Sequence, residues 1–306
     1  MLLPKTRLES GENRIFKVQT DYMKLVFSIL FTGTVVSGAF GQKNKEEQAI
    51  VDEGKALYKT EMASWYGTDL FLEQFPGKRD KIGGYLSYSE GDRTQCIFFD
   101  RSETPQLLAT ISFDSTFAIA TAQVDSVRTT LSETESSLYA IRQLALAEIN
   151  SDTLFKSYKN TNLNLIPLIW KGEKKVYVLT GPKVNGVVIF GNDYLLTFDK
   201  ANKLTEKKCL HQNIIAVDYD ESETDSKQVS AMHSHLPETG DLITVTDICT
   251  LMLYGKYAGW ESHMVVGEKS VSIWSCESNS LAVISRDTLE KIEKDQEKRK
   301  KKKQKN

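Results

Sequence analysis

The sequence contains few of the residues that most often build metal frameworks, disulfide scaffolds and linkers. Four cysteines, four histidines and six prolines occur among 306 residues. The cysteines form no Cys-x-x-Cys pair and show no regular spacing, which excludes a zinc-finger framework and a dithiol redox motif. No internal repeat and no proline- or serine-rich linker divides the chain. Each cysteine stands in an apolar context that favours packing in the core: Cys96, Cys209, Cys249 and Cys276.

The net charge of −2 is small, but the charge is unevenly distributed. Residues 291–306 carry nine Lys/Arg against three Asp/Glu, so the preceding chain sums to about −8. These basic residues occupy one low-complexity tail and not a folded face, so no nucleic-acid partner is expected. A solvated C-terminal helix is the interpretation we favour, with weak attachment to an anionic membrane surface as the alternative.

The N-terminal region predicts export. Met23 and Lys24 precede an apolar run over residues 25–40, and a small-x-small cleavage site follows at residues 39–41. The run is short for a membrane span of about 20 residues, so no stable span is expected after cleavage. We therefore interpret residues 1–41 as a signal peptide whose true start is Met23, with a periplasmic or secreted product. A first core helix or an uncleaved anchor is the alternative.

The remaining chain predicts an α+β fold that begins with a helix and an antiparallel meander. Helical spacing of apolar residues predicts helices over residues 45–66 and 244–253 and from about residue 287. Ser132 and Glu135 form a capping box that begins another helix. Strands are predicted at residues 84–89, 94–99, 107–113, 165–170, 175–180, 187–190, 194–198, 209–217, 229–235, 264–266 and 270–274. We expect an N-terminal α+β region at 42–130, a second α+β domain at 131–285 and a charged tail at 286–306.

One segment concentrates the residues that carry site chemistry. His233 and His235 end a strand-like run, and side chains two residues apart on a strand lie on one face. Asp247 follows one turn into the predicted helix, where its carboxylate can point back to the strand end. Two imidazoles and a carboxylate are the usual ligands of catalytic zinc. The competing interpretation is a chance His-x-His beside an ordinary Thr244-x-x-Asp247 capping pair.

These residues resemble the JAB/MPN (JAMM) metalloprotease signature. His233-Ser234-His235-Leu236-Pro237 is similar to its His-x-His-Pro, and Thr244-x-x-Asp247 to its Ser-x-x-Asp. The flanks are similar to the RadC-like branch of that superfamily at residues 194–202, 210–213 and 262–267. The likeness covers roughly residues 185–276. It implies a JAB/MPN-like mixed sheet with flanking helices, zinc held by His233, His235 and Asp247, and Thr244 as a hydrogen-bond donor to an oxyanion.

The sequence departs from the family pattern at three points. Leu236 is an extra residue before Pro237, and Thr244 replaces the serine. The glutamate that serves the family as general base should fall near Gly191 or Asn192, and neither can act as a base. Asp193 is the nearest carboxylate, and strand alternation is expected to place its side chain on the opposite face of the strand from that of Asn192.

Three functional hypotheses follow. The first is an exported zinc-dependent peptidase or isopeptidase with Asp193 as its base. The second is a non-catalytic cell-envelope or extracellular protein on the same fold, which binds an unknown protein or peptide and lacks the general-base glutamate. The third is an unrelated α+β protein. In all three, His211 is interpreted as structural and His263 as a satisfied histidine that packs in or beside the sheet.

Overall fold

The computed structural model describes residues 45–219 and 230–303 and confirms the α+β class. The expected signal peptide at residues 1–41 lies outside the described residues. Residues Lys45–Val283 form one compact unit. Among the described residues, no helix is both long enough and apolar enough to cross a membrane.

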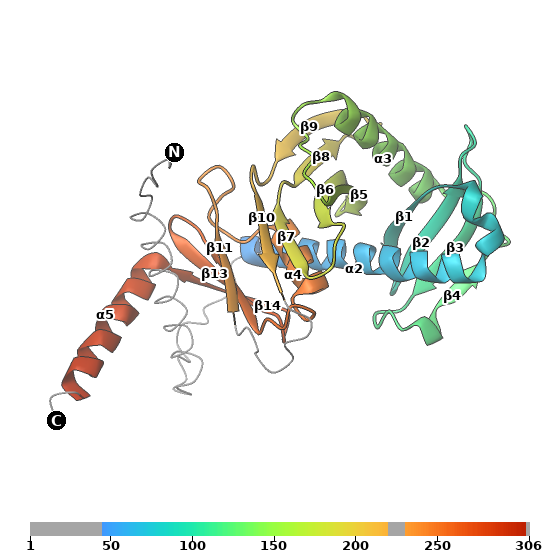
Figure 1. Cartoon of the computed structure of the whole chain (residues 1–306). Helices are drawn as coiled ribbons and strands as arrows, with labels where there is room; N and C mark the ends of the chain where they lie inside the picture. The colour runs from blue at the N-terminus through green and yellow to red at the C-terminus, as the bar shows by residue number, and fades with distance from the viewer. Residues whose placement is uncertain (1–44, 220–229, 304–306) are drawn as a thin grey trace, which may run out of the picture. The chain divides into compact units, whose positions relative to one another are not determined.

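A 30-residue helix, α2 (Lys45–Gln74), runs along this unit and contacts elements from both halves of the sequence (Figure 1). Its N-terminal half packs against α4 (Val245–Tyr254), where Val51 and Ile248 share a core cluster. Its C-terminal half packs Leu70 and Phe71 against the first sheet. The division expected near residue 130 stays a prediction, and α2 makes contacts on both sides of it.

The first sheet is an antiparallel meander with two different faces. One face contributes Phe98 and Ile111 to the core against α2, and the other contributes Leu86 and Ile97 to the core against α3. Its strands are β1 (Ile82–Glu90), β2 (Arg93–Asp100), β3 (Leu107–Phe113) and β4 (Gln123–Asp125), with short 3-10 helices at η1 (Pro76–Lys81) and η2 (Ile119–Thr121).

Helix α3 (Glu133–Ser151) begins at the predicted capping box. The Ser132 hydroxyl accepts from the Glu135 backbone N–H, and the Glu135 carboxylate accepts from the Ser132 backbone N–H. Each bond satisfies a backbone donor that the first helical turn would leave unpaired. The buried Glu135 carboxylate also pairs with Arg128 at 2.6 Å, so this end of the helix is held electrostatically as well.

The second half of the compact unit carries three further groups of strands. One antiparallel sheet has the order β5-β6-β8-β9, β7 pairs with β10, and the last sheet has the order β11-β12-β13-β14. The parallel pair β11–β12 makes this last sheet mixed. The bounds are β5 (Thr161–Trp170), β6 (Glu173–Pro182), β7 (Val187–Gly191), β8 (Tyr194–Phe198), β9 (Leu204–Cys209), β10 (Ile214–Asp218), β11 (Ser230–Ser234), β12 (Ser262–Val266), β13 (Ser270–Ser275) and β14 (Ser280–Ser285).

The structure corrects several predicted elements. The first helix continues to Gln74, because Leu70 and Phe71 extend its buried face. The strand expected over residues 209–217 was wrong: β9 ends at Cys209, β10 begins at Ile214, and His211 lies between them. Strands β4, β9 and β14 were not predicted. The basic tail does begin as a helix, α5 (Arg286–Lys303).

The close approach of α2 and α4 predicts a specific sensitivity at Gly54. A Cβ there would lie 2.7 Å from Ile248 Cγ2 and 3.2 Å from the Val245 carbonyl oxygen. We expect Gly54→Ala to destabilise the protein by about 1–3 kcal/mol through overpacking, although alanine favours helices. Denaturant unfolding measures this change. Gly77→Ala is the control, since a Cβ there meets nothing within 4 Å, and an equal effect of both would contradict the packing argument.

Candidate metal centre

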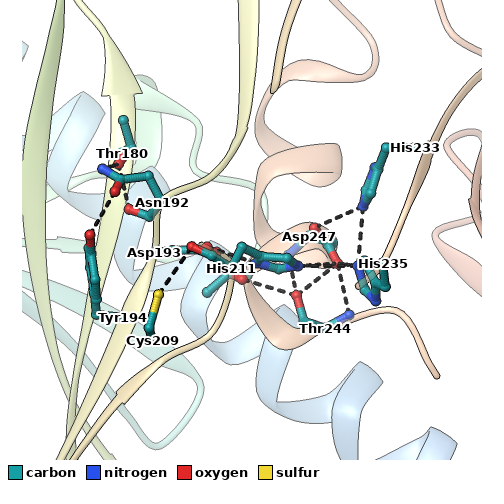
Figure 2. Close-up of polar contacts among 11 residues, drawn as sticks. Thr180, Asn192, Asp193, Tyr194, Cys209, His211, His233, His235, Thr244 and Asp247 are labelled. Atoms are coloured by element: carbon teal, nitrogen blue, oxygen red, sulfur yellow. Dashed lines mark hydrogen bonds and ion pairs between the residues drawn. The ribbon is translucent and has the colours of Figure 1, made fainter. Parts of the chain in front are cut away.

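Four buried side chains from three separate segments meet at one point (Figure 2). His233 lies on β11, and His235 is the first residue after that strand's end. Asp247 lies in the first turn of α4, and His211 lies between β9 and β10. One ligand atom from each residue lies within 4.8 Å of all the others.

Five contacts among the ligand atoms are 3.1–3.7 Å long. His235 Nε2 lies 3.1 Å from His211 Nε2, 3.3 Å from His233 Nε2 and 3.1 Å from Asp247 Oδ2. Asp247 also approaches His211 Nε2 at 3.7 Å and His233 Nε2 at 3.5 Å. Nitrogen ligands about 2.0–2.1 Å from a tetrahedral ion lie about 3.3–3.4 Å apart. The spacing therefore fits one enclosed metal ion.

The hydrogen-bonding capacity of the histidines supports the same conclusion. His235 Nε2 has three polar neighbours, but an imidazole nitrogen carries at most one proton and donates it once. Protein hydrogen bonds therefore cannot satisfy every contact that His235 Nε2 makes. A cation accepts a lone pair from each ligand atom at once. This cluster can hold a metal ion.

Asp193 orients His211. Its Oδ1 lies 2.7 Å from His211 Nδ1, which directs the opposite ring nitrogen to the cluster. Burial disfavours the charged imidazole, but the Asp247 and Asp193 carboxylates outweigh burial and raise the pKa of His211 to about 9. The Asp193 carbonyl also accepts the Leu210 backbone N–H at 2.8 Å, which ties the His211 segment to residues before β8.

Asp247 is held by the predicted capping box of α4. Its Oδ2 accepts the Thr244 backbone N–H at 2.9 Å and the Thr244 hydroxyl at 2.8 Å. Burial would raise the pKa of the carboxyl, but the nearby histidines hold it well below its usual range. Asp247 is therefore a member of both the capping box and the cluster, and the Thr244 hydroxyl donates its hydrogen bond to the Asp247 carboxylate.

An aromatic shell encloses the other side of the cluster. The Phe190 ring lies 4.9 Å from the His233 ring and 4.8 Å from the His263 ring. Burial among these rings lowers the pKa of His233 to about 4. The pKa of His263 is also well below its usual value, chiefly because of burial. Both rings are thus kept neutral, which is the state in which imidazole binds metals.

Residues near the position expected for the glutamate serve other purposes. Gly191 adopts a positive φ of 83°, and a Cβ there would lie 2.1 Å from the Asn213 carbonyl oxygen. The side-chain Nδ2 of Asn192 donates to Thr180 Oγ1, and its side-chain Oδ1 accepts from the Tyr194 hydroxyl. Neither residue presents a side chain to the cluster, as Figure 2 shows for Asn192.

The structure brings His233, His235 and Asp247 together as the sequence suggests, and it adds a residue that sequence reasoning missed. His211 was interpreted as structural, but its Nε2 belongs to the cluster. Asp193 was considered as a base, and its carboxylate bonds to His211. His263 was expected to be satisfied, but its Nδ1 is buried without a partner in the described part of the chain. The polar residues 211–213, which interrupt an apolar pattern, were the available signal for His211.

Comparison with protein-family models finds none that matches this chain. Comparisons with curated proteins and with solved structures also find no match.

Gly191 provides a test of how the His211 segment is positioned. Gly191→Ala should cost about 1–2 kcal/mol for a left-handed alanine and a further 1–3 kcal/mol for the clash with Asn213. Gly172→Ala is a matched control, because φ is 84° there and a Cβ meets nothing within 4 Å. Denaturant unfolding should therefore separate the two variants, and only Gly191→Ala should weaken the binding of a metal ion at the cluster. Equal effects on both measurements would contradict this account.

Proposed function

We propose that this chain is an exported protein in which a JAB/MPN-like domain binds one zinc ion through His211, His233, His235 and Asp247, without hydrolase activity. The observation that carries the proposal is the fourth protein ligand atom, His211 Nε2, at 3.1 Å from His235 Nε2 and 3.7 Å from Asp247. Catalytic zinc sites keep one position open for water, whereas structural sites use four protein ligands. Imidazole and carboxylate ligands at tetrahedral spacing suit zinc.

The lining of the centre also favours a structural ion. The side chains of His233, His235 and Asp247 are at most 3% exposed, and that of His211 is 10% exposed. An ion at this point would join the segment between β9 and β10, the end of β11 and the start of α4. Zinc bound in this way contributes directly to folding stability. The protein would then act by presenting a folded surface to a protein or peptide at the cell envelope or outside the cell.

An amide hydrolase is the second candidate. The order of the motif residues favours it. The Thr244 hydroxyl donates its one proton to Asp247, so it would have to give up that bond to donate to an oxyanion. In that case His233, His235 and Asp247 would hold zinc, and His211, the most exposed of the four, would leave its position to water. Bound zinc would then polarise a substrate carbonyl and acidify that water. Asp193 would act on the water only through the His211 ring, since it bonds to His211 Nδ1.

The metal content of the mature protein tests the proposal. We expect one zinc per chain by elemental analysis, and none after combined His233→Ala and His235→Ala. Chelation should lower the Tm by about 5–15 °C, because a ligand present at 100–1,000 times its Kd adds about 3–4 kcal/mol to the free energy of unfolding. Asp247→Asn should weaken zinc binding, while Asp218→Asn, on the exposed side of β10, should leave it unchanged.

Two outcomes would overturn this function. Wild-type protein without stoichiometric zinc would remove the metal centre altogether. Hydrolysis of a peptide or isopeptide library by wild type, lost in the double histidine variant, would establish the hydrolase in place of the structural site. His211→Ala separates the two further, because a fourth ligand predicts weaker zinc binding in that variant.

Export is tested by the N-terminus of the product. Expression in a bacterial host should yield an exported protein that begins at Gln42, identified by N-terminal sequencing. Gly41→Leu should block cleavage because it removes a small residue of the cleavage site, whereas Phe40→Leu should not. An uncleaved product that stays in the cytoplasm would contradict the proposal.

A further inference from the structure

His263 lies directly behind the metal centre and is not one of its four ligands. It occupies β12 and is 0% exposed. Its Nε2 lies 2.8 Å from Nδ1 of His233, on the side of the His233 ring that faces away from the other ligands. Its own Nδ1 is buried and has no hydrogen-bond partner in the described part of the chain.

This environment is unfavourable for a histidine that serves only to fill space. The His263 ring packs at 4.8 Å from Phe190 and 5.4 Å from Trp260, both apolar surroundings. Burying a ring nitrogen without a partner costs its hydration, and an apolar side chain of similar size would avoid that cost. A buried, unsatisfied polar group in such a place calls for a role other than packing.

The protonation pattern of the two rings identifies that role. If His233 binds the ion through Nε2, its remaining proton must sit on Nδ1. His263 Nε2 is the hydrogen-bond partner within reach, and it must therefore accept this proton's hydrogen bond. The proton of neutral His263 then sits on Nδ1, the nitrogen without a partner. His211 has the corresponding outer partner in Asp193, at 2.7 Å from its Nδ1.

We propose that His263 is a positioning residue that fixes the tautomer and the ring orientation of His233 for metal binding. This inference rests on the proposed zinc centre. Outer partners of this kind orient metal-bound histidines, and their removal commonly weakens metal affinity by about 10–100-fold. The unusual feature is that a neutral histidine takes the place of the carboxylate or carbonyl found at most such sites.

The test compares two substitutions that differ in hydrogen bonding. His263→Phe keeps an aromatic ring but removes the acceptor, so the zinc Kd should rise about 10–100-fold. His263→Gln can place its carbonyl oxygen near the position of Nε2, so its Kd should stay close to that of wild type. Competition titration with a chelating dye measures both. The visible spectrum of the Co²⁺-loaded protein should change in the phenylalanine variant and persist in the glutamine variant.

A packing control separates hydrogen bonding from the aromatic shell. Phe190→Leu alters the ring that contacts both histidines and leaves the His233–His263 pair chemically intact, so it should change the Kd far less than His263→Phe. Circular dichroism of each metal-free variant establishes that it folds. If His263→Phe does not fold, His263→Met replaces it as the variant without a strong acceptor.

The outcomes distinguish this inference from the proposed function. Wild-type protein that binds no zinc would overturn both. Wild-type protein that binds zinc, together with a His263→Phe variant of equal affinity and an unchanged Co²⁺ spectrum, would overturn the positioning role alone. Equal weakening by the glutamine and the apolar variants would also overturn it, because it would show that only the shape of the histidine matters.

Discussion

Three imidazole nitrogens and the two oxygens of one carboxylate meet in the interior of this protein, with contacts of 3.1–3.7 Å among them. Lone pairs at that separation repel one another unless positive charge lies between them. In the metal-free protein, the raised pKa of His211 supplies some of that charge as a bound proton. A divalent ion supplies it more completely, because it accepts an electron pair from each ligand. The four side chains can therefore hold a metal ion.

Several packing features of the fold hold the ligands in place. Glycine at position 54 allows α4 to approach α2 closely, which fixes the helix that carries Asp247. The parallel pairing of β11 with β12 sets His233 beside Val265, and the His235 backbone N–H bonds to Val266. The contact at Gly54 is apolar packing, and those of His233 and His235 with β12 are backbone bonds. Neither kind uses the side-chain atoms that could bind a metal ion.

Local patterns in the sequence explain which parts were predictable. The capping boxes at Ser132 and Thr244 depend on residues three positions apart, and both are present in the structure. The convergence of His233 and His235 was predicted from strand alternation, which the His235 backbone bond to Val266 extends one residue past the end of β11. The place of His211 depends on the pairing of β7 with β10, and that of His263 on the pairing of β11 with β12. Pairing between strands that lie far apart in the sequence cannot be predicted from the spacing of residues along one segment.

The position of His211 in the cluster depends on the close approach of its segment to Gly191. Gly191 brings the backbone of residues 210–213 so near that a Cβ at position 191 would lie 2.1 Å from the Asn213 oxygen and 3.4 Å from His211 Cβ. That approach places His211 in the cluster. A glutamate at position 191, where the JAB/MPN resemblance expects one nearby, would need this space and would displace the segment that carries His211. In this protein a glutamate at position 191 and His211 in the cluster therefore exclude each other sterically. The resulting set of four protein ligands suits an ion that stabilises the fold better than one that activates water.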